Sequence, residues 1–216
     1  MSNSPTSRKK REVAGSRDAE LTKSRILDAA EDEFAKGGLL GARTDAIAAN
    51  TKVTKAMIYY YFEDKEKLYM AVLERAFARR VAAVQQLDLV STPPEEALRA
   101  IGNSFISEVT RHPNLSTILI FEAIQNKGRF YKDIAIASLY SPMSQIIERG
   151  VKEGVFRKVD PRHAAVNIMG ACVFYFCARE NVKHLWEPGT DLLSPEMASQ
   201  HLAEAMEFVI AGLRAR

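Results

Sequence analysis

The sequence has few cysteines, no long uninterrupted apolar run and almost no strand-like alternation of polar and apolar residues. Two of its 216 residues are cysteines, Cys172 and Cys177, which are too few for a disulfide framework and lie in one apolar run. That run, residues 164–178, is interrupted by Asn167 and falls short of the about 20 residues that a membrane-spanning helix needs. The basic start of the chain has no apolar stretch behind it, unlike a secretory signal. We therefore expect a cytoplasmic protein with reduced thiols and no membrane partner.

Motifs that carry catalysis or bind metals are also missing. The chain has no phosphate-binding glycine loop, no H-E-x-x-H and no G-x-S-x-G. Its four histidines have no metal-ligand spacing and form no cluster with cysteine. They are His112, His163, His184 and His201. We expect no metal, no cofactor and no enzymatic activity.

The positive charge of the chain is concentrated at its start. The formal net charge is +3, and four of the 30 basic residues but none of the 27 acidic residues lie among the first eleven. These four are Arg8, Lys9, Lys10 and Arg11. A polar head over residues 1–19 cannot form a core, so we expect it to be disordered. Two interpretations stay open: a solvated tail, or an arm that lies along a polyanion and gains affinity from counterion release.

Helical periodicity covers almost the whole chain and predicts an all-α protein of about nine helices. A stripe formed by Ile26, Ala30 and Phe34 ends at Gly37-Gly38, a typical helix stop. Pro142 predicts a kink or break inside a helix over residues 129–149, and residues 181–193 are expected to form a loop. Further helix starts are expected at the capping residues Thr44, Thr54, Asp64, Thr92, Asp160 and Ser194.

Residues 44–62 have the layout of a helix-turn-helix, with a longer helix before two short ones. In such a motif the second short helix enters the major groove of DNA. Hydroxyls and free amides at helix starts bind phosphate oxygens, and Thr44 and Thr54 are placed at such starts. We expect Ile58 and Phe62 to be core residues. The three consecutive tyrosines 59–61 point about 100° apart on a helix, so at least one must be exposed.

Residues 20–80 resemble the DNA-binding domain of the TetR (tetracycline-repressor-like) family of transcriptional regulators. The family pattern is matched at Thr44, Ile47, Ala48, Val53, Thr54, Ile58, Tyr59, Tyr61, Phe62, Lys65, Glu66 and Leu68, with the motif over about residues 42–61. The resemblance implies phosphate contacts by Thr44, Thr54, Tyr59, Tyr61 and Lys65. It places Lys55, Ala56, Met57 and Tyr60 on the groove-facing part of the recognition helix.

The chain departs from the family pattern in the turn and in the recognition helix. Thr51-Lys52 stands where the family has Ala-Gly, and we expect Asn50, which tolerates left-handed geometry better, to absorb the bend. Ala56-Met57 replaces the common Gly-Thr. Met57 can touch a thymine methyl group but cannot select a base through hydrogen bonds, so the operator sequence does not follow from these residues.

Residues 81–216 resemble the family's helical ligand-binding and dimerisation domain in layout. The segment Gly150-x-x-x-Gly154-x-Phe156 resembles the turn before the family's penultimate helix. The helix over residues 164–178 is apolar nearly all round, which in a protein outside the membrane indicates burial on two sides. With Met206 and Val209 of the last helix offering a second surface, we expect a homodimer joined by a four-helix interface. A monomer with one central helix is the alternative.

The function implied by the resemblance is that of a sequence-specific DNA-binding transcriptional regulator, a repressor that a small-molecule effector releases from its operator. Aromatic and methionine side chains suit an apolar or aromatic effector, although side chains of this kind also fill cores. The candidates for the pocket are Phe105, Phe121, Phe130, Tyr140, Met143 and Met169. The alternative is a helical protein-interaction module of the same fold that has lost specific DNA binding, for which the altered turn is the argument.

Overall fold

A computed structural model describes residues 5–132 and 140–215, with side chains from residue 17 onward. Within these ranges the chain forms ten α-helices and one short 3-10 turn, η2, and no strand apart from an isolated bridge between Phe156 and Arg214. The all-α prediction is confirmed. The side chains of the four basic residues of the head are not among those described. Residues 133–139, in the segment where one helix was expected, lie outside the described ranges.

The chain divides into two compact units, the first ending at Val72 and the second beginning at Leu73. The boundary falls inside α4 (Lys65–Gln85), eight residues before the expected end of the DNA-binding domain at residue 80. Because one helix belongs to both units, the sequence has no Pro, Gly or polar linker at this boundary.

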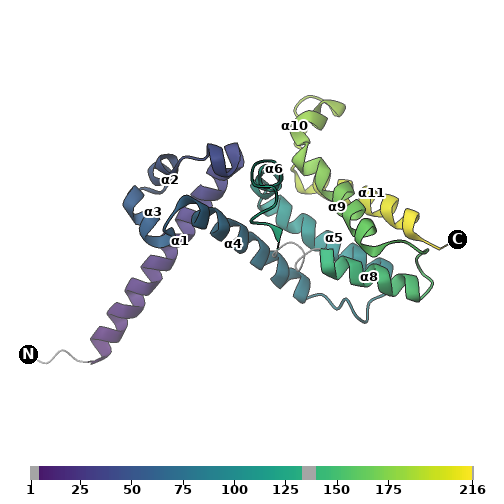
Figure 1. Ribbon diagram of the computed structural model, residues 1–216, viewed down its shortest axis with the longest axis horizontal. Coiled ribbons are helices and arrows are strands. Elements are labelled where there is room, and N and C mark those ends of the chain that lie inside the picture. Colours follow the sequence, from purple (N-terminus) through teal and green to yellow (C-terminus); the bar gives the residue numbers. More distant parts are fainter. Residues whose placement is uncertain (1–4, 133–139, 216) are drawn as a thin grey trace, which may run out of the picture. The chain divides into compact units, whose positions relative to one another are not determined.

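The first unit consists of α1 (Pro5–Gly41), α2 (Thr44–Thr51), α3 (Lys55–Phe62) and the start of α4 (Figure 1). α1 includes residues 5–19, for which composition predicts disorder. A helix can form there because proline is tolerated in a first helical turn, and because Arg, Lys, Glu and Ala favour a helix. Gly38, with φ 66° and ψ −163°, interrupts the helical course at the predicted stop. The rings of Phe34 and Tyr69 meet edge to face at 4.9 Å in the core.

The second unit contains the rest of α4 and all later helices. These are α5 (Pro94–Arg111), α6 (Asn114–Asn126), α8 (Ser141–Lys152), α9 (Pro161–Cys177), α10 (Arg179–Val182), η2 (Lys183–Leu185) and α11 (Pro195–Leu213). α9 packs against α11, α8 and α6, and α5 packs against α11 and α8 (Figure 1). The expected loop over residues 181–193 therefore begins with the end of α10 and η2. Pro142 lies in the first turn of α8, and residues 133–139, which belong to the helix expected around it, lie outside the described residues.

Several predicted helix caps are confirmed by their hydrogen bonds. The Thr54 hydroxyl accepts from the Met57 amide at 3.2 Å, and the Asp64 carboxylate accepts from the Lys67 amide at 2.8 Å. Asp160 accepts from the Arg162 amide at 2.8 Å, and the Arg162 side chain together with this amide lowers the Asp160 pKa to about 2. Ser194 likewise caps α11 by accepting from the Met197 amide.

Two predicted caps are wrong. Arg43 precedes α2 as its N-cap residue, and Thr44 is the first helical residue, whose hydroxyl bonds to a side chain instead. Pro93 precedes α5 as its N-cap residue, and the Thr92 hydroxyl donates back to the Asp88 carbonyl. Both threonines bond to partners outside the helix that they were expected to begin.

Gly150 and Gly154 explain the motif before α9. A Cβ atom on Gly150 would lie 2.2 Å from Cδ2 of the Phe156 ring, so only glycine leaves room for this ring. Gly154 has φ +75°, in the left-handed region that favours glycine. The motif thus folds the end of α8 back so that Phe156, 2% exposed, is buried beside it.

Candidate DNA-binding surface and effector cavity

The turn between α2 and α3 keeps a sharp bend without a glycine. Lys52 takes the left-handed conformation, with φ 58° and ψ 24°, at the end of α2. Asn50 remains inside α2, so the expectation that it absorbs the bend is wrong. A left-handed residue is what the end of a helix commonly requires, and a non-glycine there costs about 1–2 kcal/mol. The substitution in the family pattern therefore leaves the helix-turn-helix in place.

The recognition helix α3 has one buried and one exposed face. Ile58 is 1% exposed, as predicted, whereas Phe62 is only half-buried because it lies in the last position of α3. Tyr60 is 82% exposed, which confirms that at least one of the three tyrosines faces solvent. The four residues predicted to face the groove, Lys55, Ala56, Met57 and Tyr60, are all exposed.

A hydrogen bond between two predicted phosphate-contacting residues joins α2 to α3. The Thr44 and Tyr59 hydroxyls lie 3.3 Å apart. Thr44 is 7% exposed, while Tyr59 is 38% exposed. Tyr61 is half-buried beneath the Lys23 ammonium, which lies 5.9 Å from the ring centroid. These residues hold the recognition helix in place as well as presenting hydroxyl groups near it.

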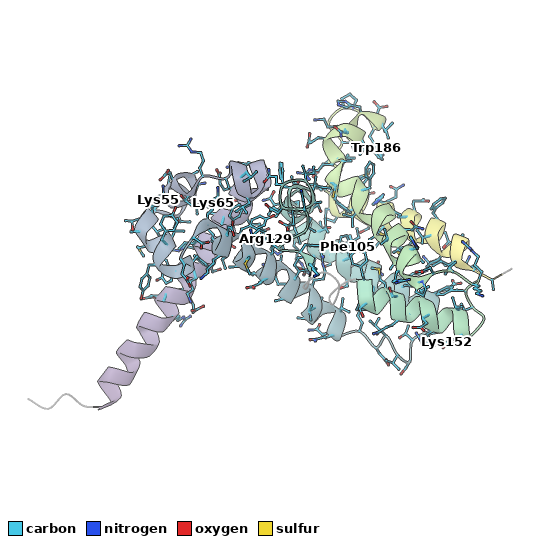
Figure 2. The ribbon with its side chains drawn as sticks, viewed as in Figure 1. Lys55, Lys65, Phe105, Arg129, Lys152 and Trp186 are labelled. Atoms are coloured by element: carbon cyan, nitrogen blue, oxygen red, sulfur yellow. The ribbon has the colours of Figure 1, made fainter. Side chains whose placement is uncertain are left out.

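The two candidate lysines differ in how tightly they are held (Figure 2). Lys55 pairs with Asp45 at 3.1 Å, but both side chains are about half exposed or more, and such surface pairs contribute only about 0.2–1 kcal/mol. Lys65 is half-buried and donates to the Ala42 carbonyl at 2.9 Å and to the Leu40 carbonyl at 3.4 Å. Lys65 therefore binds carbonyl groups at the end of α1, where a helix leaves them without partners.

Two exposed cations within the motif, Arg43 and Lys52, were not predicted to contact DNA in the sequence analysis. Arg43 immediately precedes α2, and Lys52 lies in the turn. Arg43 directly precedes Thr44, and Lys52 lies two residues before Thr54. A basic side chain at each end of a short helix is the signal that could have identified them. Within the described ranges, no helix has the length and apolar character to cross a membrane, and no group of three His, Cys, Asp or Glu could hold a metal ion.

A cavity of about 360 Å³ lies in the second unit, with a wall formed by residues of α4, α5, α6 and α9. Of the candidates for an effector pocket, Phe105, Tyr140 and Met169 line this cavity (Figure 2 labels Phe105). Phe121, Phe130 and Met143 do not. Met143, 2% exposed, is a core residue, and Phe121 lies between Ile120 and Glu122, which face the cavity. The Phe130 ring lies beside the Arg129 guanidinium at 4.7 Å.

The sequence analysis did not single out Arg80, which forms part of the cavity wall. Its side chain is 1% exposed, and its guanidinium lies 4.7 Å from the Phe105 ring and 5.3 Å from the Phe77 ring. Burial lowers the Arg80 pKa to about 10, so the group remains positively charged at neutral pH. Arg80 continues the four-residue spacing of the apolar stripe Leu68, Val72 and Ala76, and this spacing is the signal that could have marked it as buried.

The comparison with known proteins decides the family. Residues 26–72 match the family described as bacterial regulatory proteins, tetR family, and residues 94–209 match the tetracyclin repressor-like C-terminal domain. The chain belongs to the TetR family. It is a helix-turn-helix DNA-binding transcriptional regulator, and regulators of this family bind operator DNA and form dimers.

Relatives match the TetR-family chain over nearly its whole length. The HTH-type transcriptional repressor NicS of Pseudomonas putida is 32% identical over 201 residues, 91% of this chain and 94% of that protein. The HTH-type transcriptional regulator RutR of Escherichia coli O157:H7 is 28% identical over 207 residues, 93% of this chain and 94% of that one. The solved structure of the fatty acid degradation regulator FadR from Bacillus halodurans has a TM-score of 0.71 at 20% identity, covering 90% of this chain and 97% of that one, and supports the fold.

The outer faces of α9 and α11 carry exposed apolar side chains. Val166 and Phe174 of α9, which also line the cavity, are 55% and 65% exposed, and Phe208 of α11 is 80% exposed. Met206, which was expected to offer a second surface, is 2% exposed and faces the core of its own unit, where its sulfur lies 3.7 Å from the Cys172 sulfur. Val209 is half-buried and lines a groove with Phe208.

Proposed function

We propose that the protein is a dimeric repressor that binds a palindromic operator through α3 and leaves it when a small molecule occupies the cavity of the second unit. The observation that carries the proposal is the intact helix-turn-helix, in which the Thr54 cap and the Thr44–Tyr59 bond hold α3 with Tyr60 exposed. The description of NicS as a repressor supports the direction of regulation.

Phosphate contacts and base contacts fall to different residues of the first unit. Thr44, Thr54, Tyr59, Tyr61 and Lys65 would position the protein on the backbone of the duplex. Lys55, Ala56, Met57 and Tyr60 would face the base edges in the major groove. Lys55 exchanges its exposed partner Asp45 for DNA at small cost, because the pair is solvated. Met57 and Ala56 offer methyl groups, which favour contact with thymine.

The dimer would form through the exposed apolar residues of α9 and α11. Val166, Phe174 and Phe208 leave an apolar surface that a second copy of the chain can cover. A two-fold dimer presents two recognition helices about one turn of DNA apart, ~34–36 Å. An operator with two inverted half-sites follows from this symmetry.

The long helix α4 is the element through which an effector would act. It contributes Lys65 to the first unit and Arg80 to the cavity wall of the second. A ligand that binds one arrangement of α4 better than another shifts the equilibrium between them, and thereby the spacing of the two recognition helices. Release from DNA then follows without any contact between effector and DNA.

Selection of genomic DNA fragments by the purified protein tests the proposal. We expect enrichment of a few fragments that share an imperfect palindrome, and weaker enrichment by a Tyr60→Ala variant. The alternative of an interaction module without DNA binding predicts no enrichment over a mock selection, and that result would overturn the proposal. The retained bend at Lys52 removes the argument that the altered turn gave for this alternative.

A further inference from the structure

We propose that the cavity of the second unit takes an organic anion, a small molecule with one carboxylate or similar acidic group on an apolar body, and that Arg80 is its counter-charge. The inference rests on the proposed effector site and specifies the chemical class of its ligand. It starts from a cation that the described fold buries but does not pair.

Two of the three guanidinium nitrogens of Arg80 have no hydrogen-bond partner within the described part of the chain. Its Nε and Nη1 atoms are buried and make no hydrogen bond. Buried N–H groups of arginine are almost always paired, so an unpaired pair of donors calls for a partner. The guanidinium is held instead against two aromatic rings, those of Phe105 and Phe77.

The buried carboxylates of the second unit already have other partners. Glu108 accepts from Arg111 at 3.0 Å and lies 3.8 Å from Arg79. Glu122 is part of the cavity wall, but its two oxygens accept from the Phe130 amide at 2.7 Å and from the Asn126 side chain at 2.6 Å. Glu108 stabilises the Arg80 charge from a distance, but neither carboxylate forms an ion pair with it in the described part of the chain, so an anion that enters the cavity would be its direct partner.

A preformed, desolvated cation favours binding of an anion. Arginine does not lose its proton at neutral pH, so the charge of Arg80 persists inside the cavity wall. The unfavourable free energy of removing this charge from water is already part of the folding free energy. A carboxylate that forms a charge-assisted hydrogen bond with Arg80 therefore binds without desolvating the cation again. A neutral ligand of the same shape gains nothing from Arg80.

The remaining wall of the cavity defines the body of the ligand. It is mainly apolar, with aliphatic side chains at Leu115, Leu119, Ile120, Val166, Met169 and Val173. Hydroxyl groups at Tyr140 and Ser116 can donate to a second oxygen of the acid. Burial raises the pKa of Tyr131, and a hydrogen bond with the Tyr140 side chain raises it further, so this phenol stays neutral. With Arg80 as the one lysine or arginine in the described wall, a monoacid fits and a polyanion does not.

Thermal unfolding with matched acids and amides tests the assignment on the full-length protein. The probes are benzoate, 4-iodobenzoate, hexanoate, octanoate and decanoate, each beside its neutral primary amide, at the same concentration and ionic strength. We expect at least one acid to raise the melting temperature and to bind about tenfold or more tightly than its amide. Arg80→Met should reduce the affinity for this acid to that of the amide, and Arg80→Lys should keep part of the preference.

The control variant is Arg111→Met, which makes the same chemical change at an arginine outside the cavity and should keep the acid preference. Arg80→Met should fold at least as well as the wild type without ligand, because it removes an unpaired buried charge. Equal shifts by acids and amides, or no shift by any acid of the panel, would overturn the inference. Operator binding is measured separately: intact DNA binding with no acid preference refutes only the inference, and acid preference without DNA binding refutes only the proposed function.

Discussion

The ammonium group of Lys65 donates a hydrogen bond of 2.9 Å to the carbonyl oxygen of Ala42 and so ties the start of α4 to the end of α1. In the family resemblance this lysine contacts a phosphate of the DNA. An ammonium group has three donors, and the two carbonyls of Leu40 and Ala42 use two of them. The third can serve a phosphate while the other two hold the unit together.

Lys65→Ala should therefore weaken both folding and DNA binding. We expect the free energy of unfolding in urea to fall by about 1–3 kcal/mol, since carbonyl groups lose a charged donor. In a plot of the logarithm of the DNA-binding constant against the logarithm of the salt concentration, the slope should become less steep by about one unit. Lys67→Ala is the control, because Lys67 is exposed and pairs with Glu63 on the surface. Unchanged urea unfolding would show that the bonds to α1 contribute nothing.

Tyr59 and Tyr60 should have different effects on DNA recognition although they are neighbours. Tyr59→Phe removes the bond to Thr44 and should weaken binding to all sequences by a similar factor, with a loss of about 0.5–1.5 kcal/mol. Tyr60→Ala should change which bases are preferred, because Tyr60 faces outward from α3. Selection from a randomised operator library measures both effects. A changed base preference for Tyr59→Phe would contradict the assignment.

The helix-turn-helix could be predicted from the sequence because its signals are local. Thr54 and Asp64 cap helices through amides three residues away, and the stripe ending at Phe34 follows a single helix. The partners of Thr44 and Lys65 could not be predicted, because they lie 15 and 23 residues away in sequence. Such contacts depend on how helices pack, which periodicity does not specify.

The cavity was predicted less well than the recognition helix, for a related reason. A pattern of apolar residues places a side chain on a helix but does not show which neighbouring helix it faces. Phe121 and Ile120 are adjacent apolar residues of α6, yet only Ile120 lines the cavity. Arg80 was overlooked because charge normally marks an exposed position, whereas its four-residue spacing from Ala76 marked a buried one.

Gly150 should not tolerate any side chain. Gly150→Ala places a Cβ atom 2.2 Å from the Phe156 ring, and we expect the free energy of unfolding to fall by about 1–3 kcal/mol. Phe156→Leu in the same chain should recover part of this loss by removing the ring. Denaturant unfolding of the single and double variants gives the coupling between the two sites. Additive losses would show that the ring does not cause the effect.

Stability should decrease as the pH falls below 6.5 because of His201. Burial lowers the pKa of His201 below its usual 6.5, and the ring stacks on Tyr175 at 4.2 Å. The unfolded chain then binds the proton more readily, so the stabilising contribution is full above pH 6.5 and is lost as the pH falls through the folded-state pKa. His201→Gln should flatten this pH dependence, while His184→Gln, at an exposed site, should not. An unchanged profile for His201→Gln would refute the assignment.

Footprinting of the enriched DNA by wild type and Phe208→Glu tests the central claim most directly, namely that two copies read one operator through α3. The wild type should protect two inverted half-sites whose centres lie about 10 base pairs apart or a multiple of this. Phe208→Glu places a charge on an apolar surface that the dimer covers and should give folded monomers in sedimentation, with both protected half-sites lost. Leu185→Glu, at an equally exposed position of η2, should keep the footprint. A folded Phe208→Glu monomer that protects both half-sites at wild-type affinity would contradict the account.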